Sequence, residues 1–142
     1  MTTDHIGILI KKTSQAFEKS ASQVLAPYDL TPSQFKILKY VTLNPEASVR
    51  QIDLETYFGM SNPTVTGIIQ NLEKKGMIYR QSHPDDKRSK IIILSEKAKN
   101  ARHFILETSD NIEANFTKGL TPQEKDIMRT LLLKLLESSQ NI

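Results

Sequence analysis

The chain has 142 residues, of which 38% are hydrophobic and 25% charged, an ordinary globular composition for one domain with a core rather than two. Its lack of cysteine excludes disulfides, thiolate catalysis, cysteine-ligated zinc and thiol-oxidation sensing, and fits a cytoplasmic protein. The formal net charge of +3 permits a nucleic-acid or anionic-surface partner without requiring one, and we expect no membrane span because no segment is long and apolar enough.

The first third of the chain predicts two helices. Apolar residues recur at helical spacing from about residue 5 to 25, and Pro27 closes that segment. The sequence Thr31-Pro32-Ser33-Gln34 is a capping box with proline at the first helical position. It begins a second helix, which Asn44-Pro45 breaks.

Two further helices follow, joined through a glycine. The S-x-x-Q pattern Ser48-Val49-Arg50-Gln51 predicts the start of a short helix that ends at Gly59. Ser61 then caps a fourth helix, which ends at Gly76. The residues expected to face inward from these two helices are Ile52, Leu54, Phe58, Val65, Ile68, Ile69 and Leu72.

The second half of the chain predicts a hairpin and two closing helices. The β-prone runs 77–81 and 90–94 are separated by the charged, turn-forming segment 83–88. A long helix follows over about 95–117, and the capping box at 121–124 begins the last one. We therefore expect a mainly α fold, an α+β winged helix-turn-helix of six helices with a two-stranded β-wing.

The helix that begins at Ser61 is followed by a hairpin, and this is the order of elements in a unit that binds duplex DNA. A recognition helix enters the major groove with its first turn nearest the bases, while a basic hairpin tip can reach a minor groove and neutralise phosphate. A capped helix or a charged turn alone is an ordinary surface feature. We predict DNA binding because the two follow one another in this order. The candidate DNA-binding residues are Ser61, Asn62, Pro63, Thr64, Thr66, Gln70, Lys74, Lys87, Arg88 and Lys90.

These residues also carry a family resemblance. The segment from Leu54 to Arg80, with its Gly59-Met60-Ser61 turn and its Leu72-Glu73-Lys74-Lys75-Gly76 ending, resembles the MarR family of winged-helix regulators. The segment Asp86-x-Arg88-x3-Ile92-x-Leu94-Ser95 is similar to that family's wing, with Ser95 where threonine is more usual. The resemblance implies one domain over residues 1–142. Within it, about 31–95 form the winged helix-turn-helix, about 95–117 a long connecting helix, and about 1–30 and 118–142 dimerisation helices.

The resemblance also assigns roles to single residues. It implies that Asn62, Pro63, Thr64 and Thr66 face the major groove, that Arg88 reaches the minor groove, and that Asp86 braces the wing. Gly67 departs from many family members, which place a larger or basic residue there, and it weakens the helix by roughly 1 kcal/mol relative to alanine. Base specificity therefore does not carry over from the family.

A homodimer with intertwined terminal helices is implied as well. The last helix has two apolar rows, wider than one partner needs, which suits packing within the subunit and against a second one. Two recognition helices about 34 Å apart can then read a pseudo-palindrome. The expected dimer residues are Ile6, Leu9, Ile10, Leu131, Leu132, Leu135 and Leu136.

The resemblance further implies a small aromatic or lipophilic effector between the dimer helices and the winged region. Candidate lining residues are His5, Lys12, Phe17, Arg102 and His103, although a phenylalanine on a periodic stripe is usually core and an exposed lysine is usually solvated.

We accordingly expect a sequence-specific, double-stranded DNA-binding transcriptional regulator that acts as a repressor. The alternatives are a winged-helix protein-interaction module without DNA binding and a metal-responsive regulator. The histidines at 5, 83 and 103 lie in separate elements without paired spacing, so no metal site is expected. No nucleophile elbow, phosphate loop or H-E-x-x-H motif is present, so we expect neither an enzyme nor a cofactor.

Overall fold

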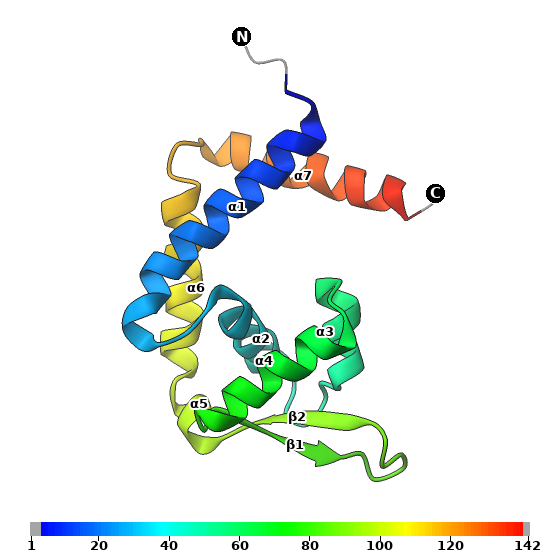
Figure 1. Cartoon of the computed structure of the whole chain (residues 1–142). Helices are drawn as coiled ribbons and strands as arrows, with labels where there is room; N and C mark the ends of the chain where they lie inside the picture. The colour runs from blue at the N-terminus through cyan, green and yellow to red at the C-terminus, as the bar shows by residue number, and fades with distance from the viewer. Residues whose placement is uncertain (1–3, 141–142) are drawn as a thin grey trace.

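The computed structural model describes residues 4–140, which form seven α-helices, one short 3-10 helix and a two-stranded antiparallel sheet (Figure 1). This is the mainly α winged helix-turn-helix fold that the sequence predicts. The elements are α1 (Ile6–Leu25), η1 (Ala26–Tyr28), α2 (Pro32–Leu43), α3 (Gln51–Phe58), α4 (Asn62–Lys74), β1 (Ile78–Ser82), β2 (Lys90–Leu94), α5 (Glu96–Asn100), α6 (Arg102–Phe116) and α7 (Pro122–Ser139).

The molecule has a helical stem and a lobe. In Figure 1, α1 and α6 lie side by side as the stem, α7 crosses at one end of it, and α2, α3, α4 and the hairpin form the lobe at the other. The stem packs through a cluster around Ala21, Leu25, Phe35, Ile105 and Ile112. Burying such side chains contributes roughly 1.5–3 kcal/mol each for the larger ones.

The lobe has its own core and packs against the stem through α2, whose Phe35 belongs to the stem cluster, and through Leu30. The ten buried members of the core come from α2, α3, α4, both strands and the segment before α3: Ile37, Leu38, Val41, Val49, Leu54, Val65, Ile69, Leu72, Ile78 and Ile92. Leu30, in the short connection between η1 and α2, packs against this core and against the stem cluster. The two halves of the molecule therefore meet along α2, which contacts α1 and α6, and at the α1–α2 connection.

The start of α3 differs from the prediction. The helix begins at Gln51 with Arg50 as its N-cap, and the backbone N–H of Arg50 donates to Asp53 Oδ2 (2.9 Å). Ser48 does not cap it, because Val49 accepts a backbone hydrogen bond from Ile92 (2.8 Å) and Arg50 forms a β-bridge with Ile91. These pairings to β2 hold residues 49 and 50 extended, so the helix cannot start before them.

The same shift changes which side chains of α3 face inward. Leu54 is fully buried and Phe58 packs against the lobe core, as predicted. Ile52 is 49% exposed, so the prediction that it faces inward is wrong.

The long helix predicted over 95–117 is two helices. It breaks at Ala101 (φ −90°, ψ 8°), whose N–H donates to the Ala98 carbonyl three residues back. On one side α5 is anchored to the lobe by buried Ala98 and by Ser95 Oγ, which donates to the Gly76 carbonyl (2.7 Å). On the other side Arg102 Nη1 donates to the Thr42 carbonyl (2.6 Å) and α6 follows the stem. Two anchors with different directions account for the break.

The last helix has an exposed apolar side. Among residues 4–140 no residue of α7 is buried, so the prediction that its two apolar rows pack within their own subunit as well as against a second one is wrong for the packing within the subunit. All seven expected dimer residues are exposed: Ile6, Leu9, Ile10, Leu131, Leu132, Leu135 and Leu136. No helix within residues 4–140 has the length and apolarity to span a bilayer.

Candidate nucleic-acid interface

The turn between α3 and α4 sets the direction of α4 relative to α3. Gly59 adopts the left-handed conformation (φ 64°, ψ 36°) that favours glycine, and the backbone N–H of Met60 donates to the Glu55 carbonyl (3.0 Å). Ser61 then caps α4 by accepting the Thr64 backbone N–H (3.3 Å). The chain thus turns within three residues from the end of one helix to the start of the next.

The two faces of α4 are sharply different. Val65, Ile69 and Leu72 are fully buried in the lobe core. The residues Ser61, Asn62, Pro63, Thr64, Gln70 and Lys74 are exposed, and Thr66 is half-buried. Because the buried row fixes the rotation of the helix, these predicted DNA-binding residues of α4 lie on its solvent side or at its exposed N-terminal end.

Two hydrogen bonds from α3 constrain the first turns of α4. Gln51 Nε2 donates to Thr66 Oγ1 (2.8 Å), and Asn62 Nδ2 donates to Glu55 Oε2 (3.0 Å). These bonds leave Asn62 Oδ1, the second Asn62 Nδ2 proton and the Thr66 hydroxyl proton for an outside partner. Sequence reasoning missed Gln51 and Glu55; the only available signal was that both are polar residues of the helix preceding the recognition helix.

Gly67 leaves open space on α4. A Cβ placed on it meets no atom within 4 Å. The subunit therefore has room for a larger side chain at this position.

The hairpin extends past α4 as an arm (Figure 1). At its tip Asp86 Oδ1 accepts the backbone N–H of Arg88 (3.0 Å) and lies 3.7 Å from Arg88 Nε. The Arg88 side chain is 96% exposed, and Lys87 is exposed beside it. Lys90, half-buried at the base of the tip, donates to Ser82 Oγ (3.2 Å). The role of Asp86 in bracing the wing stays a prediction, which these two contacts support.

An ion pair joins the hairpin to α4. Arg80 Nη2 lies 3.0 Å from Glu73 Oε1, and each side chain is about one-third exposed. The pair offsets the negative charge of Glu73 at the end of α4, so Lys74 and the wing cations dominate the charge of this face.

The five predicted effector residues do not form one site. Phe17 lines a cavity of about 410 Å³ between α1, α2, α6 and α7, whereas Arg102 lines a separate cavity of about 210 Å³ next to β2. Lys12 pairs with Asp4 (3.2 Å), His103 lies 3.2 Å from Glu107, and His5 is exposed at the start of α1; these three line neither cavity. Within residues 4–140, no three histidines or acids gather as metal ligands.

The geometry, a capped helix presented by a tight turn beside a braced basic hairpin, defines a winged helix-turn-helix protein. The family model for MarR matches residues 30–90. Along the chain, an uncharacterized HTH-type transcriptional regulator of Bacillus subtilis, YwoH, is 30% identical over 134 residues, covering 94% of this chain and 95% of the relative. A second B. subtilis regulator of that description, YdcH, is 33% identical over 93 residues, 63% of each chain.

Solved structures agree with this assignment. The S. aureus MepR–DNA complex has a TM-score of 0.84 at 27% identity and covers 95% of this chain and 98% of that one. A mutant E. coli MarR complexed with operator DNA has a TM-score of 0.79 at 25% identity, with 92% and 93% coverage. The chain belongs to the MarR family. It is therefore a transcriptional regulator and not an enzyme.

Proposed function

We propose that the protein binds duplex DNA as a homodimer and represses transcription from a pseudo-palindromic operator. The observation that carries this proposal is the pairing of the exposed, polar start of α4 with the exposed Arg88 on a braced hairpin. The DNA complexes of MepR and MarR, which share this fold over more than nine-tenths of the chain, support the proposal.

The start of α4 has the chemistry for the major groove. Amide and hydroxyl groups of Asn62, Thr64 and Thr66 can hydrogen-bond base edges, and the threonine methyl groups can meet thymine methyls. The unpaired backbone N–H groups and the positive end of the helix dipole at the same site favour a phosphate. The helix thereby combines base reading with anchoring to the backbone.

The hairpin tip supplies the second contact. Arg88 extends into solvent and its backbone is held by Asp86, so a long, charged side chain projects from a fixed base. A guanidinium suits a narrow, strongly negative minor groove, and Lys87 suits a phosphate beside it.

A dimer supplies two copies of the α4 helix and the hairpin. The exposed apolar residues of α1 and α7 form an area that a second copy would cover, and a two-fold dimer presents the same patch from both subunits. Two α4 helices about 34 Å apart would lie in successive major grooves on one side of the duplex. We place this complex in the cytoplasm, with the DNA that it would bind.

A small aromatic or lipophilic effector would fit the larger cavity and release the DNA. The cavity combines the aromatic rings of Phe17 and Phe35 with three cations and three carboxylates: Lys36, Lys39, Arg129, Glu18, Asp110 and Glu113. The cavity lies between the stem and α2 of the lobe. A ligand that binds one arrangement of stem and lobe more tightly than another would favour that arrangement. This would change the distance between the two α4 helices of the dimer. Aromatic carboxylates should then weaken DNA binding in a fluorescence anisotropy titration; compounds that bind the protein without changing DNA affinity would oppose effector-driven release.

The direct test is Arg88→Ala. We expect weaker binding to duplex DNA and a shallower dependence of log K on log salt, because a lost cation–phosphate contact releases fewer counterions. Fluorescence anisotropy at several salt concentrations measures both, with Lys118→Met as a control that removes one positive charge from an exposed position between α6 and α7. Unchanged affinity and slope for Arg88→Ala would contradict a wing–DNA contact and favour a protein-interaction module.

A further inference from the structure

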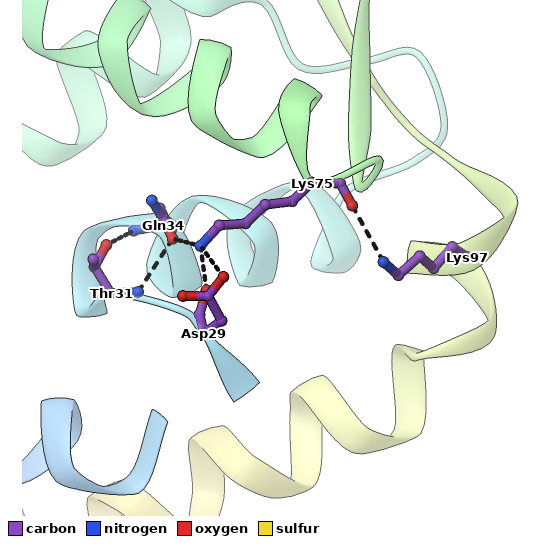
Figure 2. Close-up of polar contacts among 5 residues, drawn as sticks. All are labelled: Asp29, Thr31, Gln34, Lys75 and Lys97. Carbon is purple, nitrogen blue, oxygen red and sulfur yellow. Dashed lines mark hydrogen bonds and ion pairs between the residues drawn. The ribbon is translucent and has the colours of Figure 1, made fainter. Parts of the chain in front are cut away.

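Lys75, the residue after α4, points away from the solvent face of that helix and into the α1–α2 connection (Figure 2). Its Nζ donates to Gln34 Oε1 (2.9 Å) and to the Asp29 carbonyl oxygen, and it lies 3.7 Å from the Asp29 carboxylate. Its side chain is 27% exposed. These contacts join the end of the proposed recognition helix to a segment more than 40 residues earlier in the chain.

Two acceptors of Lys75, the Asp29 carbonyl oxygen and Gln34 Oε1, are held in place, whereas the Asp29 side chain is 96% exposed. Asp29 is in the left-handed conformation (φ 55°, ψ 44°) at the end of η1, with its N–H bonded to the Ala26 carbonyl (3.0 Å). Gln34 is 7% exposed, and its Oε1 also accepts the Thr31 backbone N–H (3.2 Å). The ammonium group of Lys75 therefore binds the same Gln34 Oε1 that closes the capping box of α2, which ties it to the start of that helix.

The backbone of Lys75 is fixed equally well. Its N–H donates to the Asn71 carbonyl (3.1 Å), and its own carbonyl accepts Lys97 Nζ (3.2 Å). The next carbonyl, that of Gly76, accepts Ser95 Oγ (2.7 Å). Figure 2 shows Lys75 between Lys97 on one side and Asp29 with Gln34 on the other. One residue thus links α4, α5 and the α1–α2 connection.

We propose that Lys75 is a positioning residue for DNA binding, which fixes the orientation of α4 relative to the dimer helix α1. The apolar contacts between lobe and stem, through Leu30 and Phe35, are non-directional, whereas the Lys75 hydrogen bonds add a fixed direction and distance. This inference rests on the proposed dimer. In a two-fold dimer a tilt of α4 occurs in both subunits, so its effect on the separation of the two α4 helices is doubled.

The consequence is that Lys75 sets how strictly the protein selects the spacing between operator half-sites. Its Nζ is engaged on the α2 side, so it is not expected to neutralise a phosphate. Removing it should change the preference for spacing while leaving the salt dependence of binding unchanged. Lys74, its exposed neighbour and a candidate phosphate contact, should show the reverse pattern.

The test compares Lys75→Met, which keeps the aliphatic stem but removes the donor, with Lys74→Met and with the control Lys118→Met. Duplexes in which the half-site spacing is varied one base pair at a time are titrated by fluorescence anisotropy at several salt concentrations, and thermal unfolding is followed for each variant. For Lys75→Met we expect roughly a tenfold loss of affinity at the best spacing, within the usual range of coupling between sites. We expect smaller losses at the other spacings and an unchanged salt slope.

The outcomes separate the two proposals. An unchanged spacing profile in a folded Lys75→Met protein would overturn the positioning role, and so would a uniform loss of affinity with a shallower salt slope. If Lys75→Met does not fold, Lys75→Gln, which is neutral, polar and too short to reach both acceptors, is judged by the same criteria. A wild-type protein that binds duplexes without any spacing preference would overturn the proposed dimeric DNA reading itself, and with it the role of Lys75.

Discussion

At the residue scale, the hydrogen bonds at the start of α4 determine what each side chain can offer to a base. Asn62 uses one Nδ2 N–H on Glu55 and keeps Oδ1 and its second N–H for a base. In the major groove, the base groups that donate are the exocyclic amines of adenine and cytosine. Asn62 Oδ1 is therefore expected to accept from one of these two bases, and Glu55 orients the amide without touching DNA.

Replacing Asn62 tests this interpretation. Asn62→Ala should remove discrimination at one base pair of each half-site, of order 1–3 kcal/mol, while non-specific binding persists. Competition binding with single-base-pair operator variants measures the effect. Glu55→Ala is the companion variant, since it keeps Asn62 but frees its Nδ2, and it should relax the preference at the same base pair. A uniform loss across all sequences would mean that Asn62 only positions the helix.

A second residue-scale prediction concerns acid stability at the start of α3. Burial raises the pKa of the Asp53 carboxyl, but the Arg50 backbone N–H and guanidinium outweigh burial, so the pKa lies below its ordinary value of 3.8. A carboxyl whose pKa is lower in the folded state stabilises the fold above its unfolded pKa, and that contribution is lost as the pH falls through the folded value.

The Asp53→Asn variant should consequently be less stable than wild type at neutral pH and lose less stability between about pH 5 and about pH 2. Urea denaturation at a series of pH values checks this. Parallel curves of stability against pH for the two proteins would show that Asp53 does not contribute in this way.

At the scale of single elements, α4 contains a glycine that lowers its helix propensity and that the packing of the subunit does not require. Gly67 lies within the helix with open space around its Cβ position. Gly67→Ala should raise the free energy of unfolding by about 1 kcal/mol through helix propensity. The midpoint of urea denaturation should rise with an unchanged m-value. A destabilised variant would show that something outside the subunit, such as a partner copy, packs against this position.

The helices, their caps and the hairpin could be predicted from the sequence because local signals specify them: Thr31, Ser61 and Thr121 cap the helices expected. The start of α3 could not, because pairing with β2 overrides the local Ser48 pattern. The break at Ala101 likewise depends on anchors from distant segments. Among the candidate site residues, sequence periodicity located the exposed side of α4, whereas Gln51, Glu55 and Lys75 emerge only once α3, α4 and the α1–α2 connection are placed in space.

At the scale of the whole molecule, the exposed apolar side of α7 and the start of α1 account for the expected homodimer. A charge placed there should separate the subunits without unfolding them, because these side chains are exposed in the single chain. We expect Leu131→Lys to lower both the fraction of dimer in analytical ultracentrifugation and the affinity for the operator. Thr130→Lys places the same charge on the opposite, polar side of α7 and is the matched control. Equal effects of the two variants would contradict a dimer seam along the leucine row.

The measurement that tests the central claim most directly is the binding of the wild-type protein to duplexes selected from its source genome, titrated over a range of salt concentrations. We expect that two chains bind one pseudo-palindromic duplex, and that log K falls linearly with log salt, with a slope proportional to the number of neutralised phosphates. Absence of salt-sensitive binding to any duplex would contradict this expectation.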